Sequence, residues 1–338
     1  MADLLDRAKN PFFEHAEAEY FVAETASGVV GRIAAIANRL HNETHGDRVG
    51  FFGFFESIDD AEVARALLDA AKAWLVERGF DTMRGPASFS VNDECGLLVE
   101  GFGSPNTIMM PHNPPYYETL LADSGLRAAK NLITYQGGHP TEPIPVPDRI
   151  ARGAELVGRR YGISIRALDL SQFKDEVERI KLLYNRCWEQ NWGAIPMTDH
   201  EIDHMAKQFR PVVVPELVPF AEHEGKPIGF GLVLPDFNQV LRTNRRGSMF
   251  PAALKLLWAL KTKRIGRCRI LLLGVLPEYR AKGVDAALYT WIWRHGQARG
   301  ITWGEAGWVL EDNQAMNAPL LKLGMTPYKT YRLFDCPL

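Results

Sequence analysis

The chain has 338 residues, 46% of them hydrophobic and 24% charged, which is typical of folded globular proteins and excludes a disordered polymer. Its length favours two domains over one, and its formal net charge of −2 excludes a uniformly basic or acidic chain. No apolar run reaches the roughly 18 residues of a membrane-spanning helix. The opening residues lack the pattern of a signal peptide, and the four widely spaced cysteines predict a reduced, cytoplasmic protein without a metal site.

The first half of the chain is expected to mix strands with helices. Between residues 60 and 78, hydrophobic residues recur at helical spacing and place Val63, Leu67 and Ala71 on one side. The other expected elements are a helix at 115–123 and strands near 18–24, 28–38, 48–55, 106–110 and 126–135.

A seam separates this half from the next. Residues 137–149, GGHPTEPIPVPDR, contain two glycines and four prolines and no apolar period, which is typical of a linker. The elements expected beyond it are helices at 171–189, 199–209, 281–298 and 313–323 and strands at 211–222, 227–234, 268–276, 302–309 and 328–334. The order suggests two copies of one α+β plan, with lobes at 1–136 and 165–338 and a connecting segment at 137–164.

Charge is distributed unevenly between the halves. Residues 1–150 hold 12 Lys and Arg against 22 Asp and Glu, a net −10, and the remainder holds 27 against 19, a net +8. No carboxylate occurs between Asp236 and Glu278, whereas nine cations do. This asymmetry indicates an anionic partner for the second half. The alternative is a solvated basic face.

The basic stretch 242–269 surrounds an apolar core, FPAALKLLWAL, that is too short to span a bilayer. Flanked by cations, it is typical of an interfacial helix on an anionic membrane surface. Two other readings remain open. It is equally compatible with an apolar wall beside an acyl chain, and with a buried helix that has a basic edge.

The expected strand at 268–276 runs into a turn with the features of a phosphate-binding site. Pro277 ends the strand and Gly283 opens the helix, while Arg280 and Lys282 lie between them. Amides in the first turn of a helix converge on one spot at the positive end of the helix dipole. Glycine lets an anion approach the main chain closely. The alternative is a plain β–α connection with a glycine for the bend.

Three stretches, in order, resemble the motifs of the GNAT superfamily of acyl-CoA-dependent N-acyltransferases. V-x-P-x-Y-R-x-x-G at Val275 to Gly283 is similar to that family's coenzyme A loop. The stretch 313-NQAMNAPLLKLGM-325 is similar to its second motif, and 328-YKTYRLF-334 to its final strand. The resemblance covers residues 165–338. It implies an α+β, tandem GNAT-like fold of two mixed-sheet lobes flanked by helices, similar to bacterial acyltransferases that include the ceramide synthases.

The resemblance also implies roles for particular residues, and no metal. A backbone N–H at Gly274 or Val275, freed by a bulge or splay in the strand, would bind the thioester carbonyl and stabilise the oxyanion. Asn313 would contact the pantetheine arm. The pyrophosphate of acyl-CoA would be held by the main chain at Arg280, Ala281, Lys282, Gly283 and Val284.

Two positions depart from the family pattern. Asp285 stands where relatives carry a small residue, and a carboxylate there repels a pyrophosphate unless it turns to its own helix. Leu320 stands where many relatives carry the tyrosine that protonates the leaving thiolate. Water, Tyr328 or Tyr331 would then donate that proton, or the thiolate, with a thiol pKa of about 8.5, would leave unassisted.

Attack by an amine also requires a base, because an amine with a pKa of about 10 is mostly protonated at neutral pH. Glu305 is the first candidate, since it lies in an expected strand of apolar or small residues next to the phosphate-binding strand. Glu189, at the end of the helix at 171–189, is the second candidate.

The first lobe lacks a comparable turn. In 53-GFFESIDDAEVARALLDAA-71 no cation or glycine joins strand to helix, and Glu56, Asp59 and Asp60 would repel a pyrophosphate. We therefore expect this lobe to be degenerate and unable to bind coenzyme A. The polar and aromatic turns at 85–96 and 112–117 either line an acceptor pocket or are plain tight turns.

These patterns predict direct transfer of an acyl group from coenzyme A to an amine, with a long-chain donor and a lipid-like amine if residues 242–269 contact lipid. The expected location is the cytoplasm, at the inner membrane face. The alternatives are a small-molecule or peptide N-acetyltransferase, an aminoacyl-tRNA-dependent transferase and a non-catalytic acyl-CoA-binding protein. Nucleic acid is disfavoured because the basic stretch offers only Phe250 and Trp258 for stacking.

Overall fold

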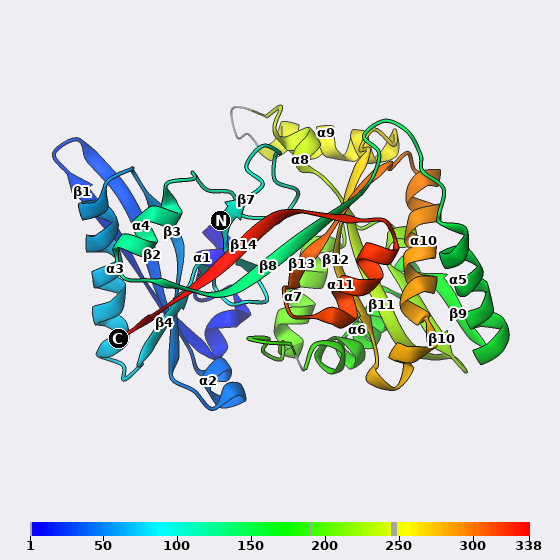
Figure 1. Ribbon diagram of the computed structural model, residues 1–338, viewed down its shortest axis with the longest axis horizontal. Helices are drawn as coiled ribbons and strands as arrows, with labels where there is room; N and C mark the ends of the chain where they lie inside the picture. The colour runs from blue at the N-terminus through cyan, green and yellow to red at the C-terminus, as the bar shows by residue number, and fades with distance from the viewer. Residues whose placement is uncertain (1, 190, 245–248) are drawn as a thin grey trace. The chain divides into compact units, whose positions relative to one another are not determined.

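The computed structural model describes residues 2–189, 191–244 and 249–338, which form two compact units (Figure 1). Unit 1 comprises the described residues within Met1–Ile133, Asn191–Ile195 and Lys329–Leu338. Unit 2 comprises the described residues within Thr134–Gln190 and Pro196–Tyr328. The divisions fall inside β8 (Arg127–Gly138) and β14 (Thr326–Pro337), so each of these strands contributes to both units.

Unit 1 is built on a mixed sheet. Its strands follow the order β1 (Ala16–Thr25), β2 (Gly28–Asn38), β3 (Val49–Ser57), β4 (Thr82–Gly85) and β14, and β7 (Leu97–Glu100) also pairs with β14. β3 and β4 are parallel, and the other pairs are antiparallel. A separate antiparallel pair consists of β5 (Ala87–Ser88) and β6 (Glu94–Cys95).

The longest helix of unit 1, α3 (Ala61–Val76), packs its apolar face onto β2 and β1. Asp60 begins it, since its carboxylate accepts hydrogen bonds from two first-turn amides at 2.8 and 3.2 Å. Leu67, Ala71 and Leu75 are buried, as their spacing predicts. The shorter helices are α1 (Ala2–Leu5), η1 (Pro11–Glu14), α2 (Arg39–His45) and α4 (Tyr117–Asp123).

The sheet of unit 2 contains one parallel pair of strands at its centre, which borders the candidate functional site. β13 (Trp303–Leu310) and β12 (Arg267–Val275) are parallel, whereas the strands beyond β12 are antiparallel to their neighbours. The full order is β8, β13, β12, β11 (Lys226–Pro235), β10 (Pro219–His223) and β9 (Ile163–Ala167).

Helices cover both faces of this sheet. On β11, Phe230 packs its ring against Trp188 of α6 (Phe173–Trp188), with centroids 5.8 Å apart. A Cβ on the next residue, Gly231, would meet Ile292 of α10 (Val284–Ala298) at 3.3 Å. Because neighbouring residues of a strand point to opposite faces, α6 and α10 lie on opposite sides. α7 (Asp199–Phe209) contacts α6, and α5 (Asp148–Tyr161) lies beside α10 (Figure 1).

The remaining helical segments of unit 2 connect these layers. They are η2 (Leu170–Gln172), η3 (Pro215–Leu217), α8 (Asn238–Leu241), α9 (Met249–Lys261), η4 (Pro277–Lys282) and α11 (Gln314–Lys322). None of the helices among the described residues combines the length and hydrophobicity needed to cross a bilayer.

Two expected strands are wrong. Residues 106–110 form a turn, in which the amide of Met110 donates to the carbonyl of Thr107 at 3.2 Å between two prolines. The strand expected at 211–222 is reduced to β10, because Pro215 opens the 3-10 turn η3. Helix α5 lies within the connecting segment and was not expected, although Pro147 before it and the left-handed Gly162 after it are ordinary helix-boundary signals.

The predicted lobes, 1–136 and 165–338, have other bounds than the compact units, and they stay a prediction. Residues Lys329–Leu338, which we assigned to the second lobe, belong to unit 1. There Phe334 and Cys336 of β14 pair with β4 and are buried in its core. The sequence did not signal this because a strand's apolar pattern says nothing about its partner.

Candidate functional site

The two parallel strands of unit 2 separate toward their carboxyl ends. β12 and β13 pair from Arg267–Trp303 to Ile270–Ala306, after which β12 continues to Val275 and β13 to Leu310. The pairing of β12 with β11 on its other side shifts register at Leu271. A bulge therefore lies in β12 one residue after the parallel pairing ends.

A buried cluster of charged groups lies at this point. Arg269 and Glu305 are 7% and 0% exposed at their side chains, and Nε of Arg269 lies 3.6 Å from Oε1 of Glu305. The other carboxylate oxygen of Glu305 accepts a hydrogen bond from the hydroxyl of Tyr328. Arg269 also donates from Nε and Nη2 to the carbonyl oxygen of Gly307, at 3.2 and 2.9 Å. A side chain thus occupies the first carbonyl of β13 beyond the paired segment.

The turn that follows β12 has the backbone expected of it. Residues Pro277–Lys282 form the 3-10 turn η4, and Gly283, with φ of +76°, begins α10. This left-handed conformation favours glycine. A Cβ at Gly283 would also lie 3.4 Å from Val157 of α5. The first-turn amides of α10 therefore follow β12 through η4, in the strand–turn–helix order of a phosphate-binding turn.

Asp285 occupies part of this helix start. The backbone N–H groups of Asp285 itself and of Ala286 lie beside its carboxylate. Burial raises the pKa of the Asp285 carboxyl, while those two N–H groups and the cation of Lys322 oppose the rise. The carboxylate thus turns to its own helix, which is the orientation that we expected if this helix start is to bind a pyrophosphate. It also competes for amides that a bound phosphate would use.

The two cations of the turn have protein partners. Arg280 donates from Nε to the carbonyl of Val275 at 3.2 Å and from Nη2 to the carbonyl of Cys187 at 2.9 Å. Nζ of Lys282 lies 4.2 Å from the ring centre of Tyr279. Arg280 thus ties the turn to β12 and α6, and both cations belong to the last turn of η4, just before α10.

Gly274 does not form the bulge that we expected there. It pairs in regular register with Phe230, and the irregularity lies three residues earlier, at Leu271. The glycine has a packing role instead, because a Cβ would lie 2.6 Å from the Trp188 ring and 2.8 Å from Cβ of Cys187. Val275 is buried, and its carbonyl accepts from Arg280.

Asn313 and its neighbours organise the end of β13. The side chain of Asn313 caps α11 by accepting from the amide of Met316 at 3.2 Å. Asn317, which the sequence did not single out, is buried and donates to the carbonyls of Leu310 and Glu311 at 3.0 and 3.1 Å. Leu320 is buried in the position where relatives were expected to carry tyrosine.

The other candidate residues belong to other elements of the fold. Glu189 is exposed at the end of α6. Tyr331 is buried in unit 1, where it pairs with Leu98 of β7, whereas the phosphate-type turn belongs to unit 2. The described residues contain no group of three or more His, Cys, Asp or Glu placed to hold a metal ion.

Comparison with known proteins identifies the family. Residues 177–325 match the model of the acetyltransferase (GNAT) family. The chain is 34% identical to "Protein YghO" of Escherichia coli (strain K12) over 333 residues, which are 97% of this chain and 84% of that protein. It is also 34% identical to "Bacterial ceramide synthase" of Caulobacter vibrioides (strain NA1000 / CB15N) over 339 residues, 98% of this chain and 87% of that protein.

A solved structure of a tandem GNAT protein from the clavulanic acid biosynthesis pathway shares the fold. It matches with a TM-score of 0.53 at 14% identity, covering 96% of this chain and 83% of that one. The match confirms the expected α+β fold of tandem GNAT type. Together with the relatives, it shows that the chain belongs to the GNAT family of acyltransferases.

Proposed function

We propose that this protein is an acyl-CoA-dependent N-acyltransferase whose transfer site lies in unit 2. The observation that carries the proposal is the left-handed Gly283 at the start of α10, which follows β12 through the turn η4 after the parallel pairing of β12 has ended. The turn offers amides for the pyrophosphate, through residues 280–284. The opening between β12 and β13 offers a path for the pantetheine arm.

In the proposed reaction an amine nitrogen attacks the thioester carbon. The new C–N bond forms as the C–S bond breaks, the amine loses a proton and the thiolate takes one up. Main-chain amides of β12 between Leu271 and Val275 are the proposed oxyanion donors, because β12 has left its pairing with β13 there.

Glu305 is the proposed base and Tyr328 the proposed proton donor. The tyrosine hydroxyl already donates to the carboxylate, so a proton can pass between them. Arg269 keeps Glu305 in its buried position. Glu189 remains the second candidate for the base and Tyr331 the second for the acid.

A long acyl donor and a lipid-like amine are proposed on two grounds. A relative covering 98% of the chain carries the name bacterial ceramide synthase. In addition, α9 presents an apolar face outward: Leu254, Leu257 and Trp258 are each 53% exposed, at the spacing of one helix face. An ordinary surface helix has polar residues on that side.

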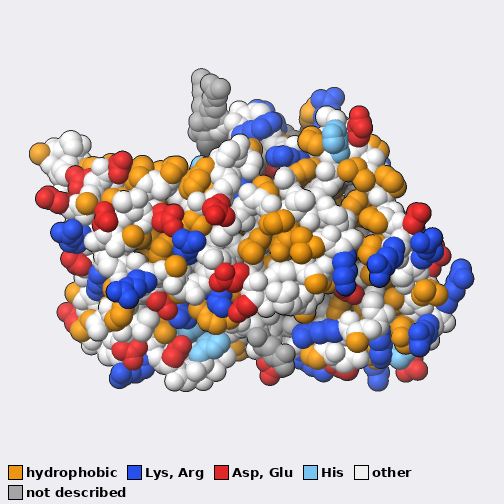
Figure 2. All heavy atoms as spheres, viewed as in Figure 1, with side chains coloured by type: hydrophobic (Ala, Val, Ile, Leu, Met, Phe, Trp, Pro, Cys, Tyr) orange, Lys and Arg blue, Asp and Glu red, His pale blue; other side chains and the backbone are white. Residues whose placement is uncertain are grey.

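The charges around α9 suit an anionic lipid surface. Basic side chains gather over α8 and α9 (Figure 2), and Lys255, Lys261 and Arg264 are exposed. Each cation near such a surface contributes about 1 kcal/mol. Other cations of the basic stretch are used internally, notably Arg269, and Arg245 and Arg246 lie outside the described residues. We propose that α9 rests on the inner membrane face.

Calorimetric titration with coenzyme A, acetyl-CoA and palmitoyl-CoA tests the proposed donor, and thiol release with a panel of amines tests transfer. We expect Gly283→Val to weaken binding of coenzyme A and of both thioesters, since valine disfavours a φ of +76°. Vesicle flotation tests α9: Leu254→Ser with Leu257→Ser should abolish binding to anionic vesicles.

One observation favours a second candidate, a protein that keeps the fold without coenzyme A chemistry. The carboxylate of Asp285 lies beside the first-turn amides of α10, where it would repel a pyrophosphate. At the corresponding helix start in unit 1, Asp60 caps α3 by accepting hydrogen bonds from two first-turn amides. Absence of binding to coenzyme A and to both thioesters would favour this candidate. Turnover only with acetyl-CoA would favour a small-molecule N-acetyltransferase.

A further inference from the structure

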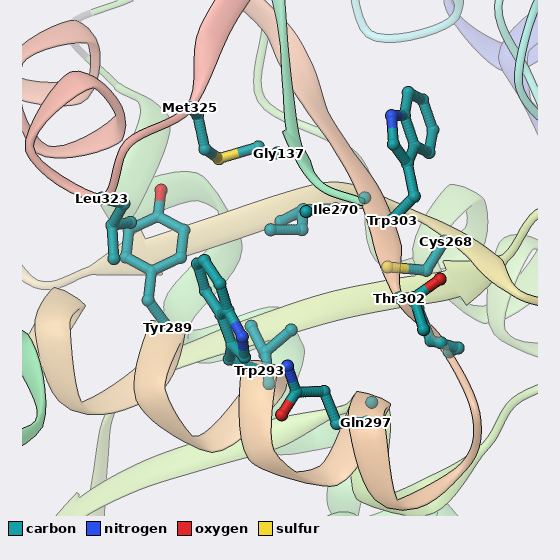
Figure 3. Close-up of a pocket in the computed structure, with 15 residues that line it drawn as sticks. Gly137, Cys268, Ile270, Tyr289, Trp293, Gln297, Thr302, Trp303, Leu323 and Met325 are labelled. Atoms are coloured by element: carbon teal, nitrogen blue, oxygen red, sulfur yellow. The ribbon is translucent and has the colours of Figure 1, made fainter. Parts of the chain in front are cut away.

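An apolar cavity lies in unit 2 between α10 and the first halves of β12 and β13 (Figure 3). Tyr289, Trp293 and Gln297 project into it from α10, and Met325 closes it from the segment after α11 (Figure 3). Ile270 forms part of its floor. The site described above does not use this cavity.

Glycines keep the cavity open. Gly296 lies inside α10, where glycine destabilises a helix relative to alanine. Packing does not require it, because a Cβ there would find its nearest neighbours at 3.7 and 3.9 Å, both on Ile301, which is ordinary contact. Gly304 on the opposite wall has only the Sγ of Cys268 within close reach, at 3.3 Å. The walls thus leave space that larger residues would fill.

The aromatic wall of the cavity is fixed in place. Nε1 of Trp293 donates to the carbonyl of Ile144 at 2.7 Å, and Nε2 of Gln297 donates to the same oxygen. Ile144 lies in the segment that leaves β8 through Gly138. That glycine passes so close to the main chain of Thr302 that a Cβ would lie 2.1 Å from its carbonyl oxygen. The connecting segment therefore holds two cavity-lining side chains rigid.

The cavity lies along the paired segment of the parallel strands and reaches the point where they begin to separate. Ile270, in its floor, is the last residue of β12 paired with β13, and the bulge at Leu271 follows at once. An acyl chain that runs from the opening between the strands back along their paired segment would therefore enter the cavity beside Ile270. The lining there is mostly carbon, so the matching ligand is an unbranched hydrocarbon chain.

We propose that this cavity binds the alkyl chain of the acyl donor. The inference rests on the proposed function and deepens it, because it assigns the donor to the long-chain class and names the residues that measure its length. If the chain is buried there, affinity should rise roughly fourfold for each methylene group that enters. The gain in affinity should stop at the acyl chain length that fills the cavity beside Trp293.

The test separates the cavity from the coenzyme A turn. Dissociation constants are measured for coenzyme A, for acetyl-, octanoyl-, lauroyl- and palmitoyl-CoA, and for free laurate as a probe that needs no turn. In the unaltered protein, affinity should climb from acetyl- to lauroyl-CoA, and laurate should bind. Gly296→Leu should abolish laurate binding and remove the chain-length gain while leaving coenzyme A affinity unchanged.

Two further variants complete the design. Ala298→Leu adds the same side chain to α10 at an exposed position and should change nothing. Gly283→Val should weaken coenzyme A binding and leave laurate binding intact. Equal affinity for acetyl- and palmitoyl-CoA, with no laurate binding, would overturn the cavity assignment while the proposed transferase stands. Laurate binding that Gly296→Leu removes, without any affinity for coenzyme A, would support the cavity and overturn the proposed function.

Discussion

Arg269 and Glu305 are buried neighbours on adjacent strands, paired in register, with 3.6 Å between guanidinium Nε and carboxylate Oε1. The same guanidinium holds the carbonyl of Gly307 where the strands separate. A charge pair inside a sheet costs desolvation energy, so it contributes to stability only while both partners are present. Its position indicates that it fixes the geometry of the strand opening.

Removing one partner of this pair should be costly. We expect Arg269→Met to lower the free energy of unfolding by about 3–5 kcal/mol, because Glu305 is left buried without its cation. The double variant Arg269→Met with Glu305→Leu should recover much of that loss. Urea denaturation of the two single variants and the double variant measures the coupling. Additive losses in the double variant would contradict a coupled pair.

The role of Glu305 in proton transfer has a different signature. Glu305→Gln keeps the size and part of the hydrogen bonding, so we expect a folded protein with transfer slowed roughly 100-fold or more, within the range of general base catalysis. Tyr328→Phe serves as the comparison, and should slow transfer by removing the proposed proton donor. An unchanged rate of transfer in Glu305→Gln would show that the residue has a structural role only.

The carboxylate of Asp285 should weaken anion binding. Asp285→Ala removes a negative charge beside the first-turn amides of α10, so affinity for coenzyme A should increase several-fold. Asp285→Asn, which removes the charge and keeps the size of the side chain, should raise affinity as well. Weaker binding in both variants would show that the carboxylate supports the ligand.

Gly274 should be intolerant of any side chain. A methyl group there would lie 2.6 Å from the ring of Trp188, so Gly274→Ala should destabilise the protein by about 1–3 kcal/mol through overpacking. Trp188→Phe in the same chain should relieve part of the loss by opening space. The matched control is Gly153→Ala in α5, where a Cβ meets nothing within 4 Å. Thermal denaturation of the three variants makes the comparison.

His41 in unit 1 predicts a loss of stability in acid. Its ring is 1% exposed on α2 and packs edge-on against Phe51, and burial lowers the pKa of His41 from 6.5 to about 4. Between those values the unfolded chain binds a proton that the folded protein does not, so the free energy of unfolding falls as pH drops from about 6.5 to 4. His41→Gln should flatten this dependence, whereas His112→Gln, at an exposed site, should not. Parallel curves for all three proteins would refute the assignment.

The local parts of the site could be predicted from sequence, and the long-range parts could not. Pro277 followed by Gly283 signals a turn into a helix, and in the structure Gly283 begins that helix with a positive φ. The charge of Asp285 at that turn was equally visible. By contrast, Arg269, Glu305 and Tyr328 come from three strands, and no period along the chain reports which residues become neighbours in a sheet. The packing role of Gly274 could not be predicted for the same reason, since Trp188 lies far away in the sequence, on α6.

The placement of Lys329–Leu338 in unit 1 has a consequence for biosynthesis. Domains usually fold in the order in which the ribosome releases them. Here β4 lacks one neighbouring strand until β14 has been translated, which happens only after all of unit 2. The two strands then pair through Phe334–Gly85 and Cys336–Met83. The N-terminal unit must therefore finish folding last, and until then an exposed strand edge requires protection from aggregation.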